Sequence, residues 1–160
     1  ILFEYNNLHP SEMEKRTEIL KHFLGATGKQ LLIEQPFRCD YGYNIRVGEN
    51  FYANMGCTIL DEALVTFGDN VLLAPNVSIY TAGHAVNVAQ RVAGWEYAYP
   101  VTVGHNVWIG GNVVILPGVS IGDNSIIGGG SVVTKDIPAN VIAVGNPCKV
   151  IRELTEDELK

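Results

Sequence analysis

The sequence predicts an all-β solenoid, a parallel β-helix of six-residue repeats, and the period of its aliphatic residues is the first observation that indicates it. Between residues 101 and 137, small or aliphatic residues recur every six positions in two series: Val101, Val107, Val113, Val119, Ser125, Ser131 and Ile137, and Val103, Ile109, Ile115, Ile121, Ile127 and Val133. A period of six fits neither an amphipathic helix, which repeats near 3.6 residues, nor a simple strand, which repeats at two. It is typical of a short strand with two inward-facing residues followed by a turn.

The residues of the turns are the second observation. Gly122-Asp123-Asn124 follows the inward pair Val119 and Ile121, and glycine and asparagine tolerate the backbone angles of tight corners. Three strand-and-turn units close one coil of about 18 residues, so Val103, Ile121 and Ala139 are expected to stack on one face. The period does not indicate the hand of the coil.

The same period begins near residue 33, where one series is Ile33, Cys39, Ile45, Phe51 and Cys57 and its companion is Val47, Ala53 and Ile59. The step from Cys57 to Val65 is longer than six by two positions, so residues 61–64 are expected to bulge outward. Segment 81–100 has no six-residue pattern and predicts a loop that protrudes from the coil. Long loops inside compact domains are often functional.

One structural domain with three parts is expected: an N-terminal helical cap over residues 1–30, the β-helix over 31–145, and a C-terminal tail over 146–160 that could contain a short helix begun at Thr155. In the cap, Ser11 and Glu14 have the spacing of a capping box. A helix over about 12–24 is predicted by one apolar stripe, which consists of Met13, Ile19, Leu20, Phe23 and Leu24. This helix would cover the open strand edges at the end of the solenoid.

The composition bounds the class of protein. Of the 160 residues, 47% are hydrophobic and 18% charged, which indicates a globular chain. The formal charge of −6 argues against a nucleic-acid binder. No apolar run reaches the roughly 18 residues of a membrane span and no signal peptide opens the chain, so a cytoplasmic location is expected. The three cysteines lack metal-binding spacing, and reduced thiols are expected.

Histidines are the first candidates for acid–base chemistry. His84 lies at the root of the protruding loop, directly after the inward-facing Ile79 and a small-residue turn, where a rigid scaffold could present it to a substrate. An imidazole there could take a proton from a hydroxyl group. His105 occupies a turn position that is filled elsewhere by Asp69 and Asp123, so it is interpreted as an exposed corner residue.

Two further groups of residues are candidates for binding. Asn54, Asp61 and Glu62 could hold sugar-like hydroxyls, or could be solvated turn residues. Gly128-Gly129-Gly130, followed by Thr134, Lys135, Lys149 and Arg152, combines exposed backbone amides with the densest positive group near the end of the chain. That combination suits a phosphate-bearing cofactor, although a solvated positive edge would have the same composition.

Together with the repeats, five blocks of sequence resemble the maltose and galactoside O-acetyltransferases of the left-handed β-helix superfamily. The blocks are Phe51-Tyr52-Ala53-Asn54, Ile59-Leu60-Asp61, Ile79-Tyr80-Thr81-Ala82-Gly83-His84, residues 129–136 (GGSVVTKD) and residues 145–152 (GNPCKVIR). The resemblance covers nearly the whole chain and implies a left-handed coil and a homotrimer with active sites between subunits. It also implies transfer of an acetyl group from acetyl-coenzyme A to a sugar hydroxyl, with no metal required.

The resemblance also implies roles for single residues. His84 matches the catalytic general base, and Asn54, Asp61 and Glu62 match positions that bind the acceptor. The positions that line the coenzyme A channel are matched by Trp108, Gly111, Gly129, Thr134, Lys135 and Arg152.

Three alternative functions stay open. The acceptor could be serine, an amino sugar or a drug instead of a sugar. The same coil also supports a zinc carbonic anhydrase, which needs three convergent imidazoles, whereas the solenoid region has only His84 and His105. A non-catalytic trimeric scaffold is the third alternative.

Overall fold

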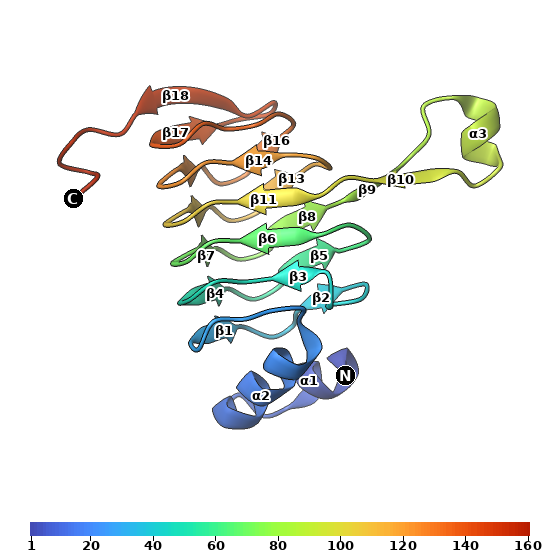
Figure 1. Ribbon diagram of the computed structural model, residues 1–160, viewed down its shortest axis with the longest axis vertical. Helices are drawn as coiled ribbons and strands as arrows, with labels where there is room; N and C mark the ends of the chain where they lie inside the picture. Colours follow the sequence, from blue (N-terminus) through green and yellow to red (C-terminus); the bar gives the residue numbers. More distant parts are fainter.

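The computed structural model describes residues 1–160 and shows a parallel β-helix with three sheets, as the period predicts (Figure 1). Sheet 1 contains β1 (Leu31–Ile33), β4 (Phe51–Ala53), β7 (Leu72–Leu73), β12 (Trp108–Ile109), β15 (Ile126–Ile127), β17 (Val141–Val144) and β18 (Lys149–Glu153). Sheet 2 contains β2 (Arg38–Cys39), β5 (Thr58–Leu60), β8 (Ser78–Tyr80), β13 (Val114–Ile115) and β16 (Val132–Val133). Sheet 3 contains β3 (Ile45–Arg46), β6 (Val65–Phe67), β11 (Val101–Val103) and β14 (Ser120–Ile121).

The chain passes from sheet 1 to 2, then to 3, and back to 1, so the coil has three corners. We call the turn from sheet 1 to sheet 2 the first corner, the turn from sheet 2 to sheet 3 the second, and the turn from sheet 3 to sheet 1 the third. The two predicted aliphatic series point into the coil, where they form most of one hydrophobic core of 32 buried residues. Ser125 and Ser131 are also buried in these series, and their hydroxyls donate to the carbonyls of Pro138 and Gly128.

Coil length departs from the predicted value at both ends of the solenoid. The regular coil is the step from Val103 to its register partner Ile121. In the first coil Leu31 pairs with Phe51 and Ile45 with Val65, which are steps longer by two positions. The addition to the first of these steps lies between Cys39 and Ile45, where the predicted series missed it, and the addition to the second is the one expected at residues 61–64. In the last coil Ile121 bridges to Ile137, which is a step shorter by two positions.

The shorter last coil overturns one prediction. Because Ile137 takes the place above Ile121, the predicted stacking of Ala139 on that face is wrong. Ala139 is exposed instead.

The third corner is built on asparagines in the left-handed backbone region. Their φ angles are between 56° and 61°, and each side chain donates to the next asparagine oxygen at 2.7 to 2.9 Å along the ladder Asn50, Asn70, Asn106, Asn124 and Asn140. Asparagine tolerates this conformation and its amide can both donate and accept. The ladder therefore ties successive coils together at the third corner.

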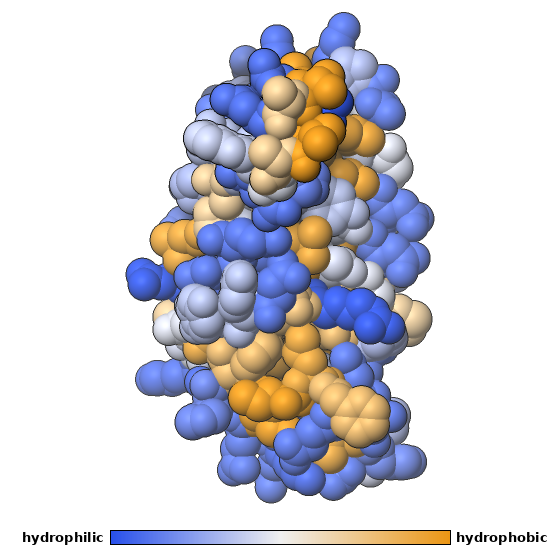
Figure 2. Space-filling model, turned by 90° about the vertical axis from the view of Figure 1, so that its right-hand side faces the viewer, coloured by the Kyte–Doolittle hydropathy of each residue, from blue (hydrophilic) through white to orange (hydrophobic).

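The predicted protruding loop is an ordered arm that extends from the second corner (Figure 1). β9 (Ala82–His84) and β10 (Glu96–Ala98) form an antiparallel hairpin, and α3 (Val88–Val92) lies at its tip. Figure 2 shows apolar side chains gathered on this arm and, at the opposite end of the molecule, over the N-terminal helices. On the arm they include Val86 and Val92, which are 89% and 81% exposed.

The N-terminal cap consists of α1 (Leu2–Asn7), which the sequence analysis did not predict, and α2 (Met13–Phe23). The predicted capping box is wrong, because Glu12 is the N-cap residue and the Ser11 hydroxyl lies 2.8 Å from His9 Nδ1 instead. Both helices cover the edge strand β1: the Tyr5 hydroxyl and Arg16 Nη2 donate to the Ile33 carbonyl. Neither these helices nor α3 is long and apolar enough to cross a membrane.

The opposite end of sheet 1 is covered by β18, which runs antiparallel to β17. The short helix considered after Thr155 is not formed. Instead, residues 154–160 make a turn in which the Glu158 amide donates to the Thr155 carbonyl at 3.1 Å.

Candidate functional site

His84 ends β9 at the base of the arm and faces Glu96 across the hairpin. The two residues are register partners, and His84 Nδ1 lies 3.6 Å from Glu96 Oε1, with both side chains about 60% exposed. Gly83 lies beneath the Tyr97 ring, where a Cβ would lie 2.5 Å from the Tyr97 hydroxyl oxygen and would displace that side chain. The hairpin therefore fixes which side chain meets the imidazole, and solvent reaches both.

Thr81 anchors the arm to the coil. Its buried hydroxyl donates to the Leu60 carbonyl at 2.7 Å and accepts from the Ala63 amide at 3.0 Å. Its carbonyl accepts from the Tyr99 amide at 2.8 Å, where the chain returns from the arm. The Thr81 hydroxyl also lies 3.4 Å from a carboxylate oxygen of Glu62. The base of the arm and the bulge below it are thus one connected unit.

Asp61 does not project outward as predicted, because it is fully buried. Its carboxylate accepts from the backbone amides of Asp40, Tyr41 and Gly42 at 3.0, 2.9 and 2.8 Å. Its own carbonyl accepts from the Asn44 side chain at 2.8 Å. Two additional residues occur at the second corner of both the first and the second coil. The Asp61 carboxylate of the second coil accepts hydrogen bonds from backbone amides of the first, which would otherwise lack an acceptor. Asp61 therefore shapes the loop at residues 40–44.

Asp40 is a further candidate residue that the sequence analysis did not name. The protein atoms that displace water from its carboxyl, and then the negative charge and hydrogen bond of Glu62, raise the pKa of Asp40. Two carboxyl groups in contact are suited to accept from, and donate to, the hydroxyls of a polar ligand. The aliphatic period does not indicate this position, because Cys39 and Ile45 lie six residues apart across it.

Asn54, Gly111 and Gly129 lie at the first corner. The Asn54 side chain accepts from the Met55 amide at 2.8 Å. Gly111 and Gly129 stack in successive coils: the Gly130 amide donates to the Gly111 carbonyl, and a Cβ on Gly129 would lie 3.2 Å from that carbonyl oxygen. Glycines here leave a column of bare backbone that a flat or elongated ligand could approach.

Trp108 and Arg152 share the outer face of sheet 1, along the row in which Trp108 pairs with Ile126, Ile126 with Ile142, and Ile142 with Arg152. Trp108 is 51% exposed. Both terminal nitrogens of the Arg152 guanidinium donate to the Glu158 carboxylate at 2.7 Å. This bidentate bond, followed by backbone donation from Thr155, lowers the pKa of Glu158 to about 2.

One chain does not bring the predicted site residues together. The second corner carries His84, Asp61 and Glu62, and further along the coil Thr134 and Lys135, both exposed after β16. The first corner carries Asn54, Gly111 and Gly129, and the width of sheet 2 separates the two corners. His84 and His105 lie at different corners, and nowhere do three His, Cys, Asp or Glu side chains form a group that could hold a metal ion.

The chain is similar to known proteins over nearly its whole length. The profile described as a bacterial transferase hexapeptide of six repeats matches residues 100–135, and the maltose acetyltransferase hexapeptide capping motif matches residues 1–28. The galactoside O-acetyltransferase of Escherichia coli is 53% identical over 156 residues, which are 98% of this chain and 77% of that protein.

Two solved structures have the same fold. A galactoside acetyltransferase in complex with coenzyme A superposes with a TM-score of 0.96 at 52% identity, covering 99% of this chain and 79% of the other. A maltose O-acetyltransferase from Clostridium difficile also superposes with a TM-score of 0.96, at 57% identity, covering 97% of this chain and 83% of the other.

Proposed function

Because the chain belongs to the hexapeptide-repeat acetyltransferases of the maltose and galactoside O-acetyltransferase family, we propose that it transfers the acetyl group of acetyl-coenzyme A to a hydroxyl group of a sugar. Acetyl-coenzyme A is the co-substrate because a relative at 52% identity binds coenzyme A on the same fold. A sugar is the acceptor class because the relatives are named for galactosides and maltose and because carboxyl groups line the second corner.

His84 is the general base, and its pairing with Glu96 is the observation that supports this role most. A carboxylate beside Nδ1 favours the tautomer with its proton on that nitrogen and leaves Nε2 free to accept. His84 Nε2 then takes the proton of the acceptor hydroxyl as the oxygen attacks the thioester carbonyl carbon. The tetrahedral oxyanion collapses, the carbon–sulfur bond breaks, and the thiolate of coenzyme A leaves with a proton from the imidazolium.

The complete site requires more than one copy of the chain, and we assign a homotrimer to it. The second corner supplies His84 and Glu62 for the acceptor, with Asp61 holding the loop beside them. The first corner of a neighbouring copy supplies Asn54, together with the bare backbone at Gly111 and Gly129 for coenzyme A. The remaining contacts with coenzyme A come from Trp108 and from the polar or cationic side chains Thr134, Lys135 and Arg152. Arginine and lysine suit its phosphates.

The experiment is a measurement of free thiol released from acetyl-coenzyme A with maltose, glucose, galactosides, serine, glucosamine and chloramphenicol as acceptors. Release that needs a sugar and falls by about 10² to 10⁴ in His84→Ala is expected. His22→Ala, an exposed histidine of α2, is the matched control and should retain full activity. Thiol release with serine or chloramphenicol but with no sugar would refute a sugar as the acceptor. Equal rates in the wild type and His84→Ala would refute His84 as the general base. Sizing in solution at the mass of one 17.4 kDa chain would refute the trimer.

A further inference from the structure

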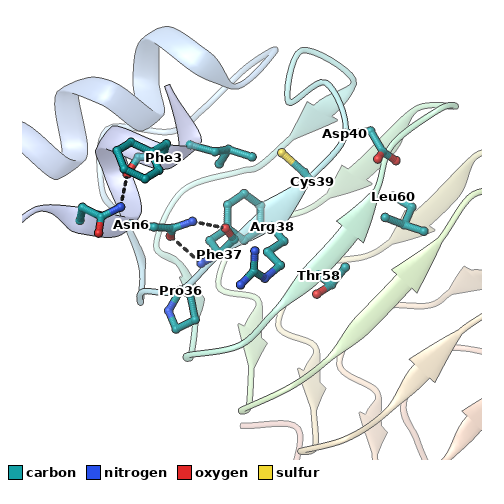
Figure 3. Close-up of a pocket in the computed structure, with 11 residues that line it drawn as sticks. Phe3, Asn6, Pro36, Phe37, Arg38, Cys39, Asp40, Thr58 and Leu60 are labelled. Atoms are coloured by element: carbon teal, nitrogen blue, oxygen red, sulfur yellow. Dashed lines mark hydrogen bonds between the residues drawn. The ribbon is translucent and has the colours of Figure 1, made fainter.

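A cavity of about 670 Å³ lies between α1 and the outer face of sheet 2 in the first two coils. Figure 3 shows Phe3 on the helix side of this cavity, and Arg38, Thr58 and Leu60 on the strand side. The wall between them is held rigidly, because the Asn6 side chain both donates to and accepts from the backbone of Phe37, at 2.8 and 2.9 Å. The volume falls in the range of sites for drug-sized ligands, roughly 300 to 1,000 Å³.

Polar and apolar groups face each other across the cavity. Arg38 and Thr58 are neighbours across the β2–β5 pair, and neither side chain makes a hydrogen bond or ion pair within the chain. Asp40 lines the same cavity and meets Glu62. The apolar wall includes the Phe3 ring, which is 82% exposed. An exposed ring opposite unpaired donors matches a sugar ring, which has apolar C–H faces and a polar edge.

Asp40 links the cavity to Glu62, one of the residues proposed to bind the acceptor, because it lines the cavity and its carboxyl contacts Glu62. Glu62 in turn lies 3.4 Å from the hydroxyl of Thr81, which directly precedes β9 and His84. The path from the cavity to the catalytic base therefore follows the second corner upward from the first coil to the arm.

We propose that this cavity binds the second ring of an oligosaccharide or glycoside acceptor, whose first ring is acetylated beside His84. This inference rests on the proposed function. The Phe3 ring packs on one face of the second sugar ring, and Arg38 and Thr58 hydrogen-bond its hydroxyls. The acceptor is not an anion, because the carboxyl groups of Asp40 and Glu62 disfavour negative charge and Arg38 alone does not balance them.

The test compares kcat/KM for maltose and glucose in the wild type and in the variants Arg38→Ala and Phe3→Ala. Each variant is expected to lower the ratio of maltose to glucose by about tenfold, the effect of losing one good polar or packing contact, while activity with glucose is retained. The matched control is Arg46→Ala, which removes an exposed arginine from sheet 3, outside the cavity. An equal loss with both sugars, or an unchanged ratio, would overturn the proposal.

Saturation-transfer NMR with maltose separates this proposal from the proposed function, because it measures binding without acetyl transfer. Saturation of the aromatic protons should reach the protons of one maltose ring, and this signal should fall in Phe3→Ala. If the wild type acetylates neither sugar yet shows this pattern, the proposed function fails and the cavity assignment stands. Transfer that is unchanged in Phe3→Ala, or absent in the wild type, would overturn the cavity assignment.

Discussion

His84 and Glu96 face each other at a distance of 3.6 Å between Nδ1 and Oε1, although the whole arm with its short helix separates them in the chain. The antiparallel register of β9 and β10 brings them together. A carboxylate in this position stabilises the imidazolium that forms when the base takes a proton. Glu96 is thus a positioning residue for the proposed reaction.

Glu96→Gln is expected to lower kcat by about tenfold and to leave KM for acetyl-coenzyme A unchanged. The loss should be smaller than the roughly 10⁴-fold effect of removing a buried carboxylate from a triad, since this pair is exposed to solvent. Steady-state kinetics with the best sugar acceptor measure it. The control is Glu14→Gln on the exposed face of α2. A raised KM with unchanged kcat would contradict the positioning role.

Asp61→Ala is expected to lower the free energy of unfolding by about 3 kcal/mol or more, because three backbone amides would lose their acceptor. Glu62→Gln alters the next residue, which is exposed, and should change stability by less than about 0.5 kcal/mol. Urea denaturation of both variants measures the difference. Equal stability of Asp61→Ala and the wild type would show that the loop at 40–44 does not depend on this carboxylate.

His105 takes the place of an aspartate in the column of turns at the third corner. Its Nδ1 accepts from the Asp69 amide at 2.9 Å, just as Asp69 and Asp123 accept from the amides of Glu49 and His105. His105→Asp should therefore preserve stability, whereas His105→Ala should cost about 1 kcal/mol for the lost hydrogen bond. Urea denaturation distinguishes them, and a fully stable alanine variant would contradict the interpretation.

The Arg152–Glu158 pair should be visible in a pH titration. The pKa of Glu158 is about 2 in the folded protein and about 4.3 for an unperturbed glutamate. A lowered pKa means that the contribution of the pair is present above about pH 4 and is lost as the pH falls toward 2. NMR of the carboxyl carbon should show the pKa of Glu158 rising in Arg152→Ala. Lys160→Ala, which removes the partner of Asp157, should leave it low, and an equal rise in both variants would contradict the assignment.

The coil could be predicted from the sequence because the residues that face its interior must be apolar or small, and they recur every six positions. The regular stretch from Val101 to Val133 repeats this requirement in every strand. The two-residue additions in the first two coils obey a different requirement, the hydrogen bonds between Asp61 and the amides of residues 40–42. Since any polar turn satisfies the aliphatic pattern equally well, that pattern does not reveal the earlier addition and it wrongly places Asp61 at the surface.

In the candidate site, the sequence predicts only those residues whose place follows from their immediate neighbours in the chain. His84 follows an inward-facing strand and begins an interruption of the period, so its position is local information. Glu96 is a candidate because it faces His84, and Asp40 because it lies beside Glu62. These contacts depend on the register of the hairpin and on the stacking of the two additions at the second corner. Ser11 fails as a cap for a similar reason, since the chain enters α2 one residue later and Glu12 occupies the cap position.

The most direct test of His84 as the general base is a single-turnover experiment. It uses acetyl-coenzyme A that carries an isotopic label in its acetyl group. Wild-type protein and His84→Gln are mixed with labelled co-substrate and maltose, and the label is followed in sugar and protein by mass spectrometry. The account predicts that label passes directly to maltose in the wild type, remains on coenzyme A in the variant, and never accumulates on the protein. Label bound covalently to the protein before it reaches the sugar, or equal transfer by His84→Gln, would contradict direct attack assisted by this histidine.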